Sequence, residues 1–116
     1  MQIKANKRLF PQEENGKDMS WSQLKSFEKQ DYQIIDIRDS VVFQTGNIPG
    51  SINIPFLKEA AKLYQIPRDK ALIVCCQKGE ISSEIVELLA DAEYEAYNLT
   101  DGFCGWLKDQ LKSDKQ

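Results

Sequence analysis

The chain has 116 residues, of which 41% are hydrophobic and 28% charged, and its formal net charge is −3. This length suits one domain with its own core, and the composition excludes a wholly disordered or fibrous protein. The weakly acidic balance disfavours nucleic-acid binding, which needs clustered basic side chains.

The predicted elements begin after a polar N-terminal stretch. Residues 1–17 carry four basic and two acidic side chains without periodicity, which predicts a loosely ordered extension rather than a docked strand. Ser20 and Gln23 match a capping box ahead of a helix predicted over about 21–29. The isoleucine-rich segment 32–38 is typical of a strand covered on both faces. The remaining predicted elements are a helix at 40–44, a strand at 52–54, a helix at 57–64, a strand at 71–75, a helix from Ser82 or Ser83 to Ala92, a strand at 95–99 and a last helix containing Trp106, Leu107 and Leu111.

Strands that alternate with helices predict an α/β domain with a parallel sheet, because parallel strands need crossover connections. We expect this domain to span 18–112 and to be followed by a polar tail at 113–116. Working groups in such folds gather beyond the carboxyl ends of the strands. Cys75 and Cys76 stand at one of these ends.

The sequence contains no histidine and three cysteines, the third being Cys104. The absence of histidine excludes a Cys/His pair, a Ser/His/Asp triad and most zinc sites, and we expect neither a metal nor an organic cofactor. No segment has the apolar length of a signal-peptide core at the N-terminus or of a membrane span later on. We therefore expect a cytosolic protein whose cysteines stay reduced.

The loop after the second cysteine is suited to a reactive thiolate. Residues 77–82 must reverse the chain before a helix begins, so several backbone N–H groups can point at the sulfur. Gly79 supplies a residue that tolerates positive φ. The helix beginning near Ser82 adds unpaired N–H groups and the positive end of its dipole. These features favour the thiolate, which is the nucleophilic form of cysteine.

Three segments together resemble one protein family, the rhodaneses. In chain order they are IIDIRDSVVFQTGNIPGSINIP, the CxxGxxS pattern of Cys76, Gly79 and Ser82, and NLTDGFCGW. The resemblance covers about 18–111 and implies a rhodanese-like α/β fold with a central, mainly parallel sheet of about five strands and helices on both faces. It also implies a sulfurtransferase in which a cysteine takes up a sulfane sulfur as a persulfide and passes it to a thiol or to cyanide. Such an enzyme works by a ping-pong mechanism and needs no cofactor.

The resemblance assigns roles residue by residue. The nucleophile falls on Cys76, and the donors around the persulfide fall on Gln77, Lys78, Gly79, Glu80, Ile81 and Ser82. Asp36 and Arg38 match the family's DxR signature beside that loop, although they fit an ion pair at a strand end equally well. The implied partners are a sulfane sulfur donor, which could be a persulfide, a polysulfide or thiosulfate, and an acceptor such as a protein thiol, but no nucleic acid and no membrane.

The chain departs from the family pattern at three places. Ile81 stands where many members have arginine, Asn47 stands where many have histidine, and Asp101 and Gly102 stand where a double glycine is common after the last strand. The missing loop arginine removes a bidentate group suited to an oxyanion, which argues against the related phosphatases and arsenate reductases. We therefore expect thiosulfate to be a poor donor unless Lys78 or Arg38 faces the pocket, and we predict a persulfide donor instead.

Acidic residues predominate after the loop. Seven acidic side chains and no basic one lie between residues 79 and 107. Glu80 and Glu84 are expected to raise the pKa of a nearby thiol, opposing the loop and the helix dipole. The helix should bury Ile85, Leu88 and Leu89 on the opposite face.

Two other functions remain open at this stage. A non-catalytic rhodanese-fold module that binds a partner protein would fit the missing arginine and the acidic helix. A thiol redox sensor would use Cys76 with Cys75 or Cys104. Strand alternation directs the Cys75 side chain away from that of Cys76, so we expect a packing role for Cys75, and packing is also expected of Cys104.

Overall fold

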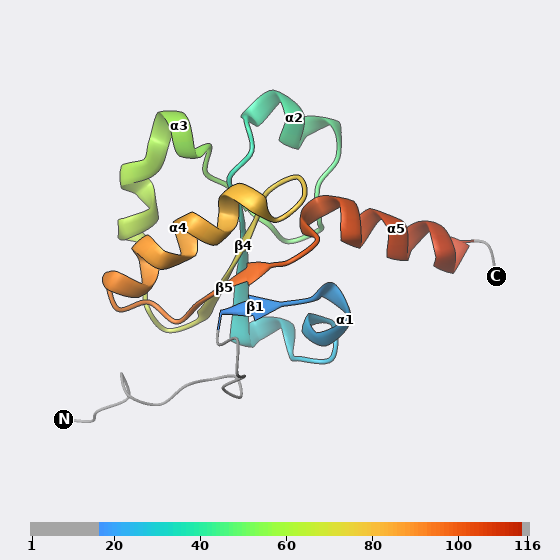
Figure 1. The fold of residues 1–116 in the computed structure, drawn as a ribbon, viewed down its shortest axis with the longest axis horizontal. Helices are drawn as coiled ribbons and strands as arrows, with labels where there is room; N and C mark the ends of the chain where they lie inside the picture. Colours follow the sequence, from blue (N-terminus) through green and yellow to red (C-terminus); the bar gives the residue numbers. More distant parts are fainter. Residues whose placement is uncertain (1–16, 115–116) are drawn as a thin grey trace.

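The computed structural model describes residues 17–114 and contains one five-stranded sheet (Figure 1). All four strand pairs are parallel, and the order across the sheet is β1-β5-β4-β2-β3. The strands are β1 (Asp18–Met19), β2 (Tyr32–Asp36), β3 (Ile52–Asn53), β4 (Ala71–Cys75) and β5 (Ala96–Leu99). The predicted parallel α/β fold is therefore confirmed. Most of the predicted N-terminal extension, residues 1–16, lies outside the described residues, as do residues 115–116 of the predicted tail.

Helices cover both faces of the sheet (Figure 1). They are α1 (Trp21–Leu24), η2 (Lys29–Asp31), α2 (Ser40–Thr45), α3 (Phe56–Glu59), η3 (Ala60–Gln65), α4 (Glu80–Asp91) and α5 (Gly102–Asp114), where η marks a 3-10 helix. The side chains buried between α1, α5 and the sheet form one core cluster, which includes Leu24 and Tyr97. A second cluster on the opposite face packs α4 and η3 against the sheet and includes Ile85 and Leu63. None of the helices between residues 17 and 114 is long and apolar enough to cross a bilayer.

Two predicted helices are shorter or tighter than expected. The capping box of Ser20 and Gln23 forms, but α1 ends at Leu24 instead of near residue 29. The hydroxyl and the amide of Ser26 both donate to the carbonyl of Gln23, which closes the chain into a tight turn there. The helix predicted over 57–64 divides into α3 and η3.

The helix after the cysteine loop also differs in detail from its prediction. It begins at Glu80, before Ser82, because Gly79 adopts φ 93° and turns the chain directly into the helix. Its buried side chains are Ser82, Ile85, Val86 and Leu89, whereas Leu88 is 45% exposed. The expectation that Leu88 is buried was therefore wrong, because the inner stripe of the helix is rotated towards Val86.

Candidate active site

The two adjacent cysteines lie on opposite faces of the sheet. Cys75, the last residue of β4, belongs to the core cluster under α1 and α5, whereas Cys76 belongs to the cluster under α4. Burial raises the pKa of the Cys75 thiol, and the neighbouring Asp36 carboxylate raises it further. Cys75 is thus held as a neutral thiol within the core, in the place that strand alternation predicts.

The sulfur of Cys76 lies inside a cradle formed by the loop that follows it. The Gly79 amide donates to Cys76 Sγ at 3.1 Å, and Ser82 Oγ lies 3.3 Å from the same sulfur. Burial raises the pKa of Cys76, but the Ser82 hydroxyl and the amides of Ser82, Gly79 and Ile81 lower it more, so the pKa falls below its ordinary value. This net direction is opposite to the effect expected from Glu80 and Glu84, and the loop is a site that favours a thiolate.

The cradle is closed by two glycines that approach backbone atoms. A Cβ atom on Gly79 would lie 2.0 Å from the Thr100 carbonyl oxygen, and one on Gly102 would lie 2.4 Å from the Cys76 carbonyl oxygen. The close approach of Gly102 allows the Phe103 amide to donate to that Cys76 carbonyl at 2.9 Å. The first turn of α5 is therefore attached directly to the backbone of Cys76, a contact that the sequence does not reveal.

Asn98 is a buried polar residue in the otherwise apolar strand β5 that sequence reasoning did not select. Its Oδ1 accepts a short hydrogen bond from Ser82 Oγ, and its Nδ2 donates to the Gly79 carbonyl oxygen at 3.2 Å. The sequence did contain a signal for it. Asn98 is an amide side chain inside a strand predicted to be buried, and a buried amide needs hydrogen-bond partners. Asn98 supports the loop from beneath.

Arg38 and Asp36 form a buried ion pair beside the loop. Arg38 Nη2 lies 2.8 Å from Asp36 Oδ2, and Arg38 Nε donates to Asp36 Oδ1 at 3.0 Å. The guanidinium also donates to the Gly46 carbonyl and to Gln77 Oε1, and its carbon lies 4.3 Å from the centre of the Phe103 ring. At most one guanidinium N–H, on Nη1, remains for a ligand, so the structural reading of this pair is the better supported one.

Removing the cation of this pair should be far more costly than removing the cation of an exposed pair. Arg38→Ala leaves the Asp36 carboxylate buried without its partner, and we expect a loss of about 3–5 kcal/mol in the free energy of unfolding. Lys62→Ala is the control, since Lys62 pairs with Glu59 at 3.2 Å while both side chains are exposed, at 59% and 40%. That variant should lose less than about 1 kcal/mol. Urea denaturation measures both, and equal losses would contradict the structural role of Arg38.

A cavity of about 470 Å³ opens onto Cys76. It is lined by Ile37, Arg38, Asp39, Phe56, Leu57, Cys76, Gln77, Lys78, Glu80 and Ile81. The loop residues that the family pattern assigns to the persulfide therefore lie together around one opening, except Gly79 and Ser82, which contact the sulfur from within. Leu57 and Ile81 are largely exposed, so part of the rim of the opening is apolar.

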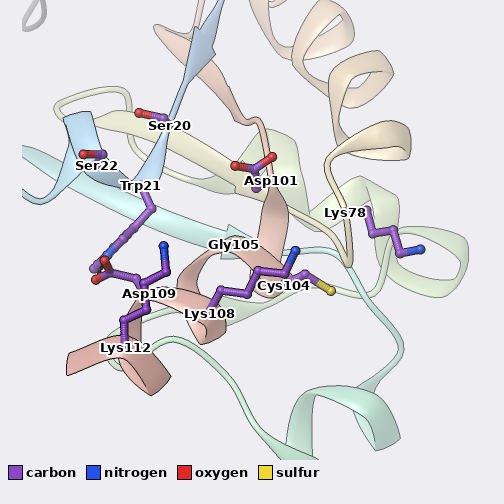
Figure 2. Close-up of a pocket in the computed structure, with 10 residues that line it drawn as sticks. All are labelled: Ser20, Trp21, Ser22, Lys78, Asp101, Cys104, Gly105, Lys108, Asp109 and Lys112. Atoms are coloured by element: carbon purple, nitrogen blue, oxygen red, sulfur yellow. Dashed lines mark hydrogen bonds between the residues drawn. The ribbon is translucent and has the colours of Figure 1, made fainter. Parts of the chain in front are cut away.

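A larger cavity, of about 660 Å³, lies on the α5 side of the loop and is not lined by Cys76 (Figure 2). Cys104 lines it and accepts a hydrogen bond from Gln77 Nε2 at 3.4 Å. Lys78 lines both cavities, and in Figure 2 its side chain extends away from Lys108. The cavity at Cys76 is the better candidate for chemistry, because the thiol that lines it has a lowered pKa and accepts a hydrogen bond from the Gly79 amide. Within residues 17–114 no three His, Cys, Asp or Glu side chains are grouped to hold a metal ion.

Comparisons with known proteins agree with this fold and loop. The model of the family "Rhodanese-like domain" matches residues 21–109. A thiosulfate sulfurtransferase, GlpE, of Shewanella oneidensis is 33% identical over 92 residues, which cover 78% of this chain and 91% of that protein. An HTH-type transcriptional regulator of Mycobacterium tuberculosis is 29% identical over 85 residues, and the match covers 72% of this chain but only 38% of the regulator.

Solved structures give the same result. A rhodanese-related protein from Thermoplasma volcanium superimposes with a TM-score of 0.74 at 26% identity, covering 80% of this chain and 92% of that one. A rhodanese-like domain protein from Staphylococcus aureus gives a TM-score of 0.70 at 26% identity, covering 78% and 90% of the two chains. Sequence, fold and loop geometry thus agree, and the chain belongs to the rhodanese-like domain family, several of whose relatives are named sulfurtransferases.

Proposed function

We propose that residues 18–112 form a sulfurtransferase that carries a sulfane sulfur as a persulfide on Cys76 and delivers it to a thiol or to cyanide. The observation that carries this proposal is the hydrogen-bonded cradle around the Cys76 sulfur, with the Gly79 amide at 3.1 Å and a lowered pKa. A sulfur that served only to pack the core would not need amide donors. The names of the GlpE relatives support the same reaction class.

The reaction would proceed in two displacement steps that balance without a redox partner. The Cys76 thiolate attacks the outer sulfur of a donor R–S–SH, so a new S–S bond forms while the donor's own S–S bond breaks. The bonding electrons leave with the donor as R–S⁻, and Cys76 carries the persulfide. An acceptor thiolate or cyanide then attacks the outer sulfur, and Cys76 leaves as the thiolate.

The loop would stabilise the negative charge on the persulfide. Amides of Gly79, Ile81 and Ser82 already act on the Cys76 sulfur, and the outer sulfur would extend into the cavity beyond them. The Gln77 side chain accepts a hydrogen bond from Arg38 and donates one to Cys104 Sγ, and not to the Cys76 sulfur. Gln77 would therefore have a supporting role. A reducing cytosol would keep Cys76 from forming a disulfide between cycles.

A persulfide fits this cavity better than thiosulfate does as the donor. Thiosulfate is a dianion, and a bidentate cation is the natural partner of an oxyanion. The Arg38 guanidinium already donates to the Asp36 carboxylate through Nε and Nη2, so it cannot offer a bidentate contact to a donor. Ile81 is uncharged, and Glu80, which lines the cavity, repels anions.

Lys78 does line this cavity, the condition under which thiosulfate was expected to be used, and it has no ion pair among residues 17–114. Its ammonium is a single point charge without the bidentate geometry of arginine, and Glu80 opposes it. The apolar part of the rim, Leu57 and Ile81, suits a protein thiol or a small-molecule thiol as acceptor.

Intact-mass measurement tests the proposal directly. The reduced protein is incubated with a glutathione persulfide donor and, separately, with thiosulfate, and the mass is recorded before and after a thiol acceptor is added. We expect one added sulfur with the persulfide and its removal by the acceptor. No adduct with any donor would favour a non-catalytic binding module, and a loss of two hydrogens would favour a thiol redox sensor.

Replacing Ile81 by arginine should restore the use of thiosulfate. Ile81 is 61% exposed and lines the cavity, so the longer side chain can be accommodated without disturbing the core. A new charged hydrogen bond to the donor dianion is worth roughly 1.5–3 kcal/mol, so kcat/KM for thiosulfate should rise roughly tenfold or more. Ile81→Gln is the uncharged control. Equal efficiency with thiosulfate and persulfide in the unmodified protein would contradict the proposed donor preference.

A further inference from the structure

A chain of buried polar groups leads from Cys76 into the sheet. Ser82 Oγ lies 3.3 Å from Cys76 Sγ and makes a short hydrogen bond with Asn98 Oδ1. Asn98 Nδ2 lies 3.2 Å from the Gly79 carbonyl oxygen and 3.4 Å from Asp18 Oδ1. Ser82 is fully buried and Asn98 is 5% exposed. The proton arrangement in this chain can be worked out from its donors and acceptors.

The orientation of the Asn98 amide follows from its neighbours. The Gly79 carbonyl and the Asp18 carboxylate can only accept hydrogen bonds, so the Asn98 NH₂ group must face them. The other end of the amide can then only accept. Ser82 has a single hydroxyl hydrogen, and this hydrogen must point to Asn98 Oδ1. Ser82 therefore presents a lone pair to Cys76, an arrangement that suits a thiol S–H and not a thiolate.

We infer that Asn98 is a positioning residue that sets the direction of the Ser82 hydroxyl and, through it, the protonation of Cys76. The inference rests on the proposed role of Cys76 as the nucleophile. When Cys76 loses its proton, its sulfur can only accept, so the Ser82 hydroxyl must turn towards it. Asn98 Oδ1 then loses its donor, and an unpaired buried acceptor is costly. The thiolate is consequently less stable than it would be beside an unrestrained serine.

This arrangement favours sulfur uptake in the proposed cycle. In the persulfide, the inner sulfur of Cys76 is bonded to a second sulfur and bears neither a proton nor the main charge. The Ser82 hydroxyl can then return to Asn98. The bond between Ser82 and Asn98 is thus present in the thiol and in the persulfide and is broken only in the free thiolate. Asn98 therefore shifts the balance from thiolate towards persulfide.

The charged groups around this chain do not change when Asn98 is replaced. Asp18 faces Asn98 from β1, while Arg38, Asp39, Lys78 and Glu80 line the cavity on the other side of Cys76. An uncharged replacement leaves all of these charges in place. A change in the titration of Cys76 can then be assigned to hydrogen bonding rather than to a new charge.

The test is a double-mutant cycle read by titration. Asn98→Leu, which keeps the side-chain volume, and Asn98→Ala are each made with Ser82 present and in the Ser82→Ala background. Alkylation of Cys76 by iodoacetamide is followed across pH by peptide mass, without any sulfur donor. With Ser82 present, the midpoint should move to lower pH, and the thiolate fraction well below the midpoint should rise roughly fivefold, the factor of one net hydrogen bond. In the Ser82→Ala background, neither substitution should move the midpoint to lower pH.

Two results would overturn the inference. One is the same shift in both backgrounds, which would mean that Asn98 acts by packing alone. The other is a shift to higher pH with Ser82 present. Because alkylation needs no sulfur donor, this outcome is independent of whether a persulfide forms. A coupled titration without any persulfide would support the inference about Asn98 while rejecting the proposed function.

Discussion

Replacing Cys76 by serine is expected to abolish the sulfur adduct and to lower the rate of sulfur transfer roughly a thousandfold or more, as is usual when a covalent nucleophile is lost. A serine hydroxyl does not ionise near neutral pH, and neither the Gly79 amide nor the Ser82 hydroxyl can change that by a sufficient margin. The measurement is intact mass after incubation with a persulfide donor, together with the rate of transfer to a thiol acceptor.

The other two cysteines supply matched controls for this substitution. Cys75→Ala alters a fully buried thiol on the far face of the sheet and should lower stability while retaining the adduct. Cys104→Ser alters a partly exposed thiol that lines the other cavity and should retain both the adduct and the transfer. An adduct that persists in Cys76→Ser and disappears in either control would assign the nucleophile to a different cysteine.

Gly79→Ala should unfold the loop and remove much of the domain's free energy of unfolding. The residue has φ 93°, and an added Cβ would lie 2.0 Å from the Thr100 carbonyl oxygen and 2.7 Å from its carbon. These are backbone atoms at the end of β5, so they cannot move aside as a flexible side chain could. We expect a loss of about 3–5 kcal/mol, a large part of the stability of a small domain.

Gly50→Ala separates the two causes of that loss, which are the strain of a positive φ and the contact of the added Cβ with Thr100. Gly50 has φ 87°, close to that of Gly79, but an added Cβ would meet nothing within 4 Å. This variant should therefore show only the strain of a left-handed conformation, about 1–2 kcal/mol. Urea denaturation compares the two variants, and equal losses would mean that the contact with Thr100 is not what requires glycine at position 79.

The hydrophobic pattern was sufficient to predict the main strands and their parallel arrangement. The predicted strand 71–75 coincides with β4, since an apolar run bounded by polar loops is covered on both faces in this class of sheet. β1 escaped prediction because it has only two residues and no pattern of its own. It exists through its pairing with β5, where the Thr100 amide donates to the Met19 carbonyl at 3.0 Å. Such a strand depends on tertiary context rather than on local preference.

The candidate site divides in the same way. The spacing of Cys76, Gly79 and Ser82 favoured Cys76 over Cys75, and this choice stays a prediction; in the structure the Gly79 amide donates to the Cys76 sulfur and Ser82 Oγ lies beside it. Burial is what raises the pKa of the Cys76 thiol, and hydrogen bonds outweigh it; their number cannot be counted before the loop is folded. The part played by Asn98 was not visible either, because it lies far along the chain from the loop it supports.

By itself, the sequence determined the class of fold, the family resemblance and the cysteine placed after the central strand, because these depend on hydrophobic periodicity and on local spacing. Only the tertiary structure decided which groups surround the sulfur. Arg38 is held by Asp36, the first turn of α5 is attached to the Cys76 carbonyl, and Asn98 reaches Ser82 from a neighbouring strand. Asp36 and Arg38 are only two residues apart. The other two contacts join residues that are distant in sequence, and only the packing of the sheet and its helices brings them within hydrogen-bonding range.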